Sequence, residues 1–355
     1  MTDNKNANEL LQWGLRNAPA RPDGSSSVAE VSEAIAQGRR PDLADPGLFD
    51  ALMGKSEAQM MREELAVGSD TRRSVEDRTT ALDNFEMLIE TVDNANNMQN
   101  MNMWPAVVHL LQEPTPAIQQ ASAWIVGTAV QNNDKGQVAA LEHGALARLL
   151  ELLSSPSKDV RNKAMYGIGA MIKNFPYAAL QFSELHGWDA LHAGLLDSSI
   201  AVRSKVAFLL NQLLSEDASH AVPNTHSAPP TSDAHAPLEK GPATLQFSAP
   251  APDVAKAMVD HRILDTLLAS VLPNATQAAA TCDGEPTRSY LDYAGKAVQT
   301  LVTYSAHAPV PREAFQALLA ELDAAPSASE PGIASRAAEL GIDNAALDTL
   351  RSAIA

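Results

Sequence analysis

The side chains that most often carry out catalysis are dispersed along this chain of 355 residues. Nine histidines occur, and those in or beside the regularly patterned part stand singly, at His109, His143, His186 and His192. A stretch rich in Pro, Ser and Ala holds three more, His220, His226 and His235. Their spacings of six and nine residues give no regular geometry for metal ligands. Cys282 is the only cysteine, so neither an internal disulfide nor a cysteine-based zinc site can form.

The sequence motifs of the common enzyme classes are also absent. The chain has no GxxxxGK[ST] phosphate loop, no HExxH zinc motif, no CxxC pair and no GxSxG nucleophile elbow. Gly167-Ile-Gly169 is the nearest approach to a dinucleotide-binding GxGxxG motif, but it lacks the third glycine and the preceding strand, so it indicates helix packing. We therefore expect no enzyme activity, no catalytic residue, no cofactor and no metal, and a protein that acts by binding.

One apolar pattern recurs at a fixed interval in the first two thirds of the chain. Its three copies begin 42 residues apart, at Ile118, Val160 and Val202. The shorter apolar segment before each copy keeps the same interval, at Trp104, Leu146 and Trp188. A repeat of about 40 to 47 residues with two or three helices and no strand is typical of armadillo and HEAT proteins. Such units stack because none buries its apolar side alone, so the sequence predicts an all-α, armadillo/HEAT-like right-handed α-solenoid.

Three further features of the repeats carry structural expectations. Each copy has an aromatic residue at the same position, and we expect these residues in the core: Trp124, Tyr166 and Phe208. Breaks before the copies, where Ser or Asp caps and a first-turn Pro are expected, fall at 113–116, 154–157 and 197–199. A capping-box-like start at Ser74 predicts a long helix through Val92, closed by a polar turn at residues 93–97.

The remaining segments differ in composition. Residues 1–70 contain only short helical segments broken by Pro and Gly, too short to be stable alone, so we expect a mobile N-terminal arm. The repeats occupy residues 71–214. Residues 215–252 are rich in Pro, Ser and Ala and predict an insertion loop. Helical patterning over 253–355, interrupted by a second loop at 273–287, predicts a last repeat and a cap.

The charge of the chain limits the partners that it can bind. The net charge is −17 and no long run of Lys or Arg occurs, so nucleic acid and anionic membranes are unfavourable partners. The first residues lack the apolar core of a signal peptide, and no stretch of about 18 apolar residues follows. We expect a monomer in the cytosol and leave access to the nucleus open.

Two segments carry a resemblance to a known family. Residues 83–97, Asp-Asn-Phe-Glu-Met-Leu-Ile-Glu-Thr-Val-Asp-Asn-Ala-Asn-Asn, and residues 127–133, Gly-Thr-Ala-Val-Gln-Asn-Asn, resemble the cytosolic nucleotide exchange factors of the 70-kDa heat-shock chaperones, in their armadillo-type, fungal branch. Leu10-Leu-Gln-Trp13 looks like the N-terminal arm of the same family. The likeness extends over residues 8–16 and 42–215 and is weak after them.

This resemblance implies a fold, a partner and a mechanism. Such factors hold one lobe of the chaperone's nucleotide-binding domain against the concave side of the solenoid and displace the other lobe, so that ADP leaves. Their mobile N-terminal arm occupies the chaperone's peptide groove and helps the client polypeptide to leave. The resemblance therefore implies a nucleotide exchange factor without catalysis of its own.

The resemblance also suggests where the partner binds. By family position, six residues fall on the clamping face: Asp93, Asn94, Ala95, Asn96, Asn97 and Lys205. The phase of the repeats adds three polar positions at the starts of the later copies: Arg161, Lys163 and Arg203. The alternative for the basic residues is an ordinary solvated helix face, and Asn clusters commonly cap helices or form turns.

A second function remains open, that of an armadillo adaptor which holds a different, basic or extended peptide. Import receptors of this kind use an array of Trp with Asn four residues later. Here Thr128, Ala170 and Gln212 stand at that offset, so the array is absent. The acidic net charge still leaves room for basic cargo.

Overall fold

The computed structural model describes residues 55–221, 249–272, 287–324 and 335–355. Over these residues the chain is helical and contains no strand, which confirms the all-α prediction. The chain divides into two compact units, residues 1–62 and 63–355, and the repeats belong to the second unit. No helix among the described residues combines the length and apolar character needed to cross a membrane.

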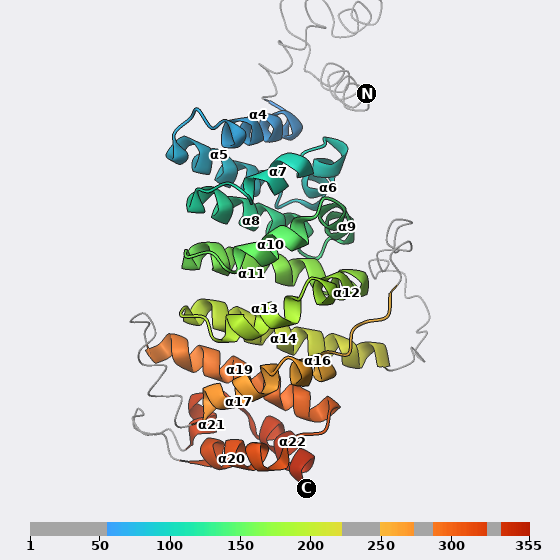
Figure 1. Cartoon of the computed structure of the whole chain (residues 1–355), viewed down its shortest axis with the longest axis vertical. Helices are drawn as coiled ribbons and strands as arrows, with labels where there is room; N and C mark the ends of the chain where they lie inside the picture. Colours follow the sequence, from blue (N-terminus) through green and yellow to red (C-terminus); the bar gives the residue numbers. More distant parts are fainter. Residues whose placement is uncertain (1–54, 222–248, 273–286, 325–334) are drawn as a thin grey trace, which may run out of the picture. The chain divides into compact units, whose positions relative to one another are not determined.

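Three kinds of helix alternate along the second unit (Figure 1). The first helices of the repeats are α6 (Val92–Asn100), α9 (Asp134–Glu142), α12 (Pro176–Glu184) and α16 (Val254–Asp260). The second helices are α7 (Trp104–Leu110), α10 (Ala145–Leu152), α13 (Gly187–Leu195) and α17 (Ile263–Val271). The third helices are α8 (Pro116–Val130), α11 (Lys158–Ile172), α14 (Ile200–Ala221) and α19 (Thr287–His307). Before and after the repeats lie α4 (Glu57–Ser69), α5 (Val75–Leu88), α20 (Arg312–Asp323), α21 (Arg336–Glu339) and α22 (Asn344–Ile354).

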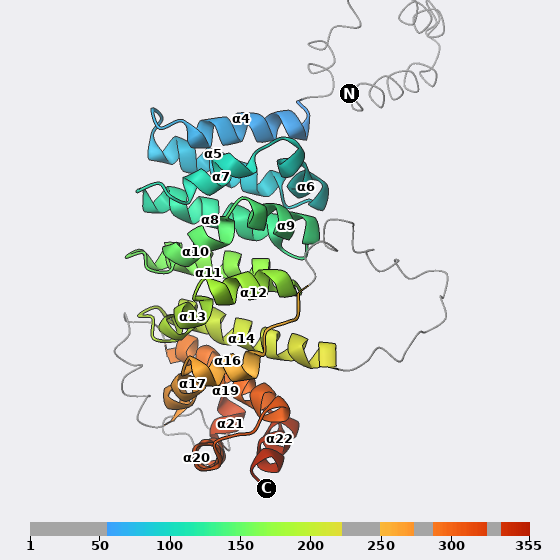
Figure 2. The same ribbon diagram turned by 45° about the vertical axis from the view of Figure 1, so that its right-hand side comes forward.

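The third helices form the spine of the stack. Helix α5 packs on α8, α8 on α11, α11 on α14 and α14 on α19, an order that both Figure 1 and Figure 2 show. The residues that begin the three sequence copies, Ile118, Val160 and Val202, are each at most 1% exposed. The 42-residue interval therefore marks the core between the layers, as predicted.

A sharp turn joins the first helix of each repeat to the second. One residue of each turn has positive φ, and these residues are Asn102, Gly144, His186 and Arg262. The first three of them lie 42 residues apart. Glycine and asparagine adopt this left-handed conformation easily, whereas in His186 and Arg262 it brings Cβ close to the following carbonyl oxygen and is unfavourable. The repeat thus conserves the backbone conformation of the turn even where the side chain does not favour it.

The end of α11 shows how the layers satisfy backbone groups that a helix terminus leaves free. The side-chain amide of Gln137, on α9, donates to the carbonyls of Ala170, Met171 and Lys173 at 2.9, 3.1 and 2.9 Å. These carbonyls belong to the last turn of α11, which has no intrahelical donors for them. A single buried glutamine therefore joins the first helix of this repeat, α9, to the third helix of the same repeat, α11.

Two expected boundaries differ from the structure. The polar turn expected at residues 93–97 is wrong, because these residues lie within α6. The amide of Asn94 donates to the Leu88 carbonyl at the end of α5, and Ala95 and Met98 are buried, so the asparagines support a new helix. The single helical pattern expected from Asp253 to Leu272 is divided into α16 and α17 by the turn at Arg262.

The arm and loops are described only in part. Residues 1–54 and most of the expected loops, with Cys282, His226 and His235, lie outside the described residues. Within the predicted arm, α4 is a regular helix from Glu57 to Ser69, longer than the short segment expected there. Helix α14 continues to Ala221, past the expected end of the repeats.

Candidate partner-binding face

Helices α5, α8, α11, α14 and α19 pack one on the next, and the side of this row that carries Trp124, Tyr166 and Phe208 is here called the third-helix face. The periodic aromatic residues lie on this face, so their assignment to the core is wrong. Trp124 and Tyr166 are half-buried, and Phe208 is 50% exposed. The core positions of the same helices are filled by neighbours such as Ile125 and Ile168, both fully buried. Each of the three helices thus presents one aromatic ring outward.

Lysines from the next helices lie beside these rings. The Nζ of Lys163, on α11, is 3.2 Å from the centroid of the Trp124 ring. The Nζ of Lys205, on α14, is 5.9 Å from the Tyr166 ring centroid. Both distances are within the range of cation–π attraction. The two predicted site residues therefore occupy equivalent places in successive repeats.

Helix α19 continues the row with Lys296. Its ammonium donates to the Asp292 carboxylate at 2.7 Å and to the Ser204 hydroxyl at 2.9 Å. Burial lowers the pKa of Lys205, and the charge of Lys296 lowers it further. Burial also lowers the pKa of Lys163, an effect that Glu86 opposes and Lys205 reinforces. The charge of Lys205 is therefore opposed by that of Lys296, and the charge of Lys163 by that of Lys205.

The opposite end of the third-helix face is acidic. Glu86, on α5, accepts a hydrogen bond of 2.6 Å from the Thr128 hydroxyl and is 6% exposed. Burial raises the pKa of the Glu86 carboxyl, and the neighbouring charges of Glu90 and Asp83 act in the same direction. Charge therefore changes sign along the face, from carboxylates on α5 to ammonium groups on α14 and α19.

A groove of about 550 Å³ opens on this face between α11, α14 and the turn that follows α8. Tyr166, Lys205 and Phe208 contribute to its walls, together with Gln131. The Tyr166 hydroxyl donates to the Gln131 side chain at 2.6 Å, which fixes the ring at the groove edge. The groove thus combines aromatic surface with hydrogen-bonding groups, as binding sites commonly do.

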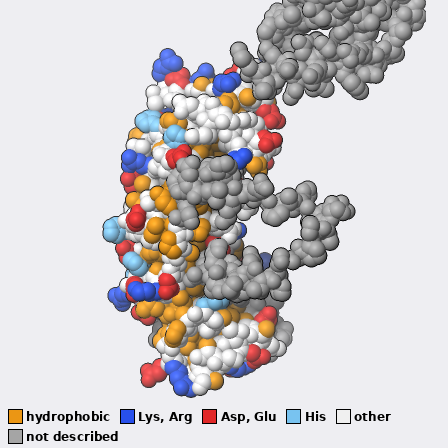
Figure 3. Space-filling view, turned by 90° about the vertical axis from the view of Figure 1, so that its right-hand side faces the viewer, with side chains coloured by type: hydrophobic (Ala, Val, Ile, Leu, Met, Phe, Trp, Pro, Cys, Tyr) orange, Lys and Arg blue, Asp and Glu red, His pale blue; other side chains and the backbone are white. Residues whose placement is uncertain are grey.

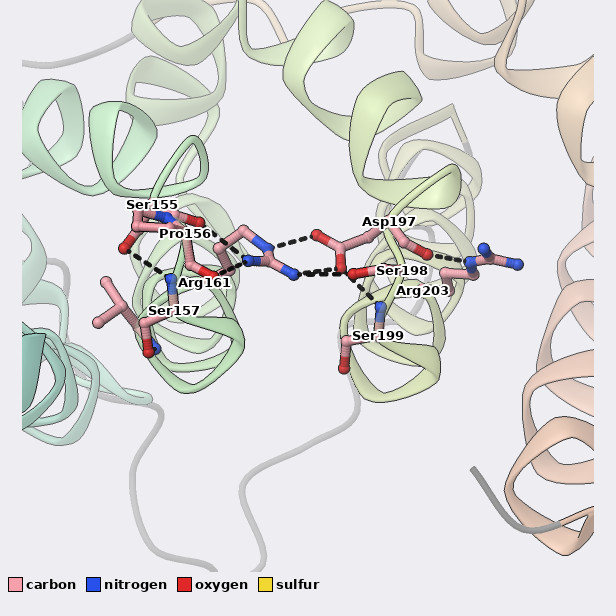
Figure 4. A network of polar contacts seen from close by, with 9 residues as sticks. Ser155, Pro156, Ser157, Arg161, Asp197, Ser198, Ser199 and Arg203 are labelled. Atoms are coloured by element: carbon pink, nitrogen blue, oxygen red, sulfur yellow. Dashed lines mark hydrogen bonds and ion pairs between the residues drawn. The ribbon is translucent and has the colours of Figure 1, made fainter. Parts of the chain in front are cut away.

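Arg161 and Arg203, by contrast, form part of the scaffold (Figure 4). Arg161 donates to the Asp197 carboxylate at 2.6 and 2.7 Å and to the carbonyls of Ser155 and Pro156. Arg203 donates to the Asp197 carbonyl. Because these guanidinium groups hold the loops before α11 and α14, their interactions are structural.

The segment from Asp93 to Asn97 occupies a first helix and not a third helix. Its helix, α6, packs against α8 and α9. Asp93 is exposed, Asn96 and Asn97 are partly exposed, and Asn94 and Ala95 are buried at 6% and 3%. The Asn97 side chain accepts from Asn100 at 3.3 Å, whereas the Asn96 Oδ1 atom is buried without a hydrogen-bond partner. Only part of this segment is therefore accessible to a partner.

The first-helix side of the stack has a different surface. Figure 3 views this side, and its visible part shows hydrophobic side chains gathered along the middle, with charged side chains mainly toward the ends and edges. Among the described residues no group of three or more His, Cys, Asp or Glu side chains could hold a metal ion. The row of lysines and aromatic rings on the third helices is the candidate site because Lys163 and Lys205 lie over Trp124 and Tyr166 at equivalent repeat positions.

Sequence reasoning missed the aromatic residues and Lys296 as parts of this face. A signal was present for two of the rings, because polar residues follow Trp124 and Phe208 at helical spacing. Thr128 and Gln131 follow Trp124, and Gln212 follows Phe208, at intervals of four or seven residues, so ring and polar residues share one side of a helix. Lys296 carried no such signal, since α19 lies outside the 42-residue register.

Comparisons with known proteins match most of the chain. The family model described as "Nucleotide exchange factor Fes1" matches residues 7–98, and the model of the SIL1/FES1/HPBP1 C-terminal domain matches residues 94–237. The Hsp70 nucleotide exchange factor FES1 of Mycosarcoma maydis is 45% identical over 375 aligned residues, which cover 96% of each chain. The protein of the same name from Cryptococcus neoformans var. neoformans is 38% identical over 207 residues, covering 55% of this chain and 54% of that protein.

Solved structures support the fold. A designed armadillo repeat protein in complex with the peptide (KR)4 is similar to this chain with a TM-score of 0.54. The similarity covers 85% of this chain and 100% of that chain at 14% sequence identity. At this identity the likeness concerns the fold alone, and it agrees with the predicted armadillo-type stack of helices.

Proposed function

Because the chain belongs to the Fes1 family of nucleotide exchange factors, we propose that it promotes ADP release from Hsp70 by holding the nucleotide-binding domain against the third-helix face. We infer exchange activity from the similarity to the Mycosarcoma maydis factor, which extends over 96% of the chain. Of the predicted site residues, Lys163 and Lys205 lie on this face, beside the rings of Trp124 and Tyr166, and we propose that they contact Hsp70.

The proposed mechanism rests on differential affinity. A factor that binds the open nucleotide-binding domain more tightly than the closed one shifts the domain toward the open state. If this binding lowers the affinity of Hsp70 for ADP by some factor, ADP lowers the affinity of Hsp70 for the exchange factor equally. The chain needs no catalytic group or cofactor for this task, since association itself supplies the free energy.

The charges of the third-helix face support a protein partner with acidic surface. Lys163, Lys205 and Lys296 lie in one row on a chain whose net charge is −17. A basic peptide, the partner of the alternative adaptor function, would meet like charges along this row. The row therefore favours the exchange function over the adaptor function.

We extend the proposal to the N-terminal arm and to location. Residues 10–13 resemble the family's arm, so the arm is assigned to the peptide groove of Hsp70, where it helps the client to leave. The protein acts in the cytosol as a monomer, and access to the nucleus is left open. A variant without residues 1–40 should still release ADP but should slow the release of a fluorescent client peptide. Loss of both activities would assign the arm to the clamp instead.

The decisive experiment follows a fluorescent ADP analogue as it leaves a fungal cytosolic Hsp70 in a stopped-flow instrument. The full chain at a few micromolar should accelerate release strongly. Lys205→Glu should weaken this effect, and more so at low salt, because screening reduces charge interactions. Lys256→Gln, on α16, serves as a control for the loss of a lysine elsewhere. No acceleration by the folded full chain would overturn the proposed function.

A further inference from the structure

The surface around Phe208 has a shape that the exchange function does not by itself require. Lys205 and Phe208 lie three residues apart on α14 and line two hollows at once. One hollow, of about 550 Å³, lies toward α11, and the other, of about 740 Å³, lies toward α19. The two side chains therefore form a ridge between two hollows, defined here as the Lys205–Phe208 ridge.

The Lys205–Phe208 ridge exposes an aromatic ring where burial would be expected. Phe208 is 50% exposed, although its equivalents Trp124 and Tyr166 have a lysine above the ring. Half-exposed large aromatic side chains beside a concave surface are typical of the anchor positions of protein interfaces. The ring thus offers apolar contact area that no described residue of the chain fully covers.

The charges around the ridge are predominantly basic. The two hollows are lined by four cationic side chains, Lys173, Lys205, Arg288 and Lys296, and by two carboxylates, Asp134 and Asp292. Asp292 already accepts a hydrogen bond from Lys296. Among the described residues no carboxylate forms an ion pair with Lys205. The ridge therefore presents positive charge that lacks a counter-charge within the described part of the chain.

We infer that the Lys205–Phe208 ridge receives a loop of the Hsp70 nucleotide-binding domain in which an apolar side chain stands next to carboxylates. The apolar side chain packs on the Phe208 ring, and the carboxylates pair with Lys205 and with Lys296 or Arg288. This inference rests on the proposed function and adds the chemistry of the segment that is bound. It also makes Phe208 a residue that determines specificity.

Electrostatics and packing act together in this arrangement. A carboxylate that approaches Lys205 relieves the repulsion between Lys205 and Lys296, so pairing gains more than it would at an isolated lysine. An apolar side chain on Phe208 removes water from the same place, which strengthens the adjacent ion pair. A basic loop would be repelled, and a purely apolar one would leave the ammonium groups unpaired.

The first test locates the loop by cross-linking. Phe208 is replaced by p-benzoylphenylalanine in the full chain, and the complex with nucleotide-free Hsp70 is irradiated and analysed by mass spectrometry. We expect the adduct on a residue of the nucleotide-binding domain within three positions of Asp or Glu. An adduct in a Lys- or Arg-rich loop, an adduct in the peptide-binding domain, or no adduct in a complex that still forms would overturn the inference.

The second test measures the contribution of the ridge to affinity. Phe208→Ala should weaken binding to Hsp70 about tenfold, as expected for an anchor residue. Leu196→Ala, which truncates a side chain that is 61% exposed on the second-helix side, should change affinity less than about twofold. Circular dichroism of both variants shows that the fold is kept. Equal affinities of the two variants would overturn the inference.

The two proposals fail in distinguishable ways. If the unmodified chain does not accelerate ADP release, the proposed function fails. If it accelerates release and Phe208→Ala is as active as Leu196→Ala, exchange activity stands and only the assignment of the ridge fails. Lys205→Gln provides a further check, because the dependence of affinity on salt should become weaker in this variant than in Lys256→Gln.

Discussion

The guanidinium group of Arg161 donates hydrogen bonds of 2.6 and 2.7 Å to the carboxylate of Asp197. This pair joins the first turn of α11 to the loop before α14, and its side chains are only 12% and 9% exposed. Arg78 and Glu113 form the equivalent pair between α5 and the loop before α8, at 2.7 and 3.1 Å. Nearly buried ion pairs of this kind hold successive layers in register.

We expect Arg161→Ala to reduce the free energy of unfolding by about 3 kcal/mol, because it leaves the carboxylate of Asp197 nearly buried without its partner. Arg148→Ala is the matched control, since Arg148 pairs with Glu151 at side-chain exposures of 40% and 61%. Exposed pairs contribute little, so the control should lie within about 0.5 kcal/mol of the unmodified chain. Urea denaturation followed by circular dichroism measures both. Similar losses in the two variants would contradict a bracing role of the Arg161 pair.

Two glycines at equivalent repeat positions should respond to alanine with opposite signs. A Cβ at Gly127 would lie 2.3 Å from the ring of Tyr166, whereas a Cβ at Gly169 would meet only Leu209 methyl groups, at 3.7 Å or more. Gly127→Ala should therefore lower the free energy of unfolding by about 1–3 kcal/mol through overpacking. Gly169→Ala should raise it by about 0.5–1 kcal/mol through helix propensity. Both variants replace Gly by Ala at the same position of the repeat, so their urea denaturation midpoints can be compared directly.

Ala95 and Asp93 allow binding and folding to be separated on α6. Ala95 is 3% exposed, so Ala95→Arg should destabilise the chain by more than about 2 kcal/mol through overpacking and a buried charge. Asp93→Arg places the same side chain on an exposed position of the first turn. We expect Asp93→Arg to keep its thermal midpoint and to change ADP release only if the start of α6 contacts Hsp70. An unchanged thermal midpoint for Ala95→Arg would contradict the packing described for α6.

The 42-residue periodicity made the fold predictable, but it did not predict which side chains lie on the third-helix face. The apolar interval through Ile118, Val160 and Val202 depends on burial, which acts identically in each layer, so the repeat could be read from the sequence. The orientation of Trp124 and Phe208 could not be read in the same way, because large aromatic rings occur both in cores and at interfaces. Their outward position follows from the packing of α8 and α14 between two neighbours each.

The basic candidate residues show the same limit. Repeat phase suggests Arg161, Lys163 and Arg203, and family position suggests Lys205, with nothing in the sequence to separate them by role. The structure separates them, because a guanidinium at position 161 donates to the Asp197 carboxylate in the following loop, whereas the ammonium at position 163 lies over the ring of Trp124. Which carboxylates lie within reach is a property of the stacked loops, and no local sequence pattern encodes it.

The pH dependence of stability should show the burial of Glu86. Because burial raises the pKa of this carboxyl above its ordinary value of 4.5, the folded chain binds the proton more tightly than the unfolded chain does. The contribution of Glu86 to the free energy of unfolding therefore falls as pH rises from about 4.5 through the raised pKa. Glu86→Gln keeps an acceptor for Thr128 and removes this titration. The stability of the variant relative to the unmodified chain should rise over that window and then level off. A constant difference in urea denaturation at several pH values would contradict it.

The charge of the third-helix face also predicts whether the chain binds a basic peptide there. A similar fold is found in a designed armadillo repeat protein in complex with the peptide (KR)4, so the same peptide is a fair probe. Lys163, Lys205 and Lys296 lie on the third-helix face of this chain, and like charges oppose the binding of a basic peptide there. Fluorescence anisotropy should therefore detect no binding of labelled (KR)4 to this face at micromolar concentration. The acidic net charge of −17 can attract the peptide elsewhere, so each titration is repeated with Phe208→Ala. Binding that is tight in the unmodified chain and lost in Phe208→Ala would favour the adaptor function, whereas weak, salt-sensitive binding equal in both chains is the expected result.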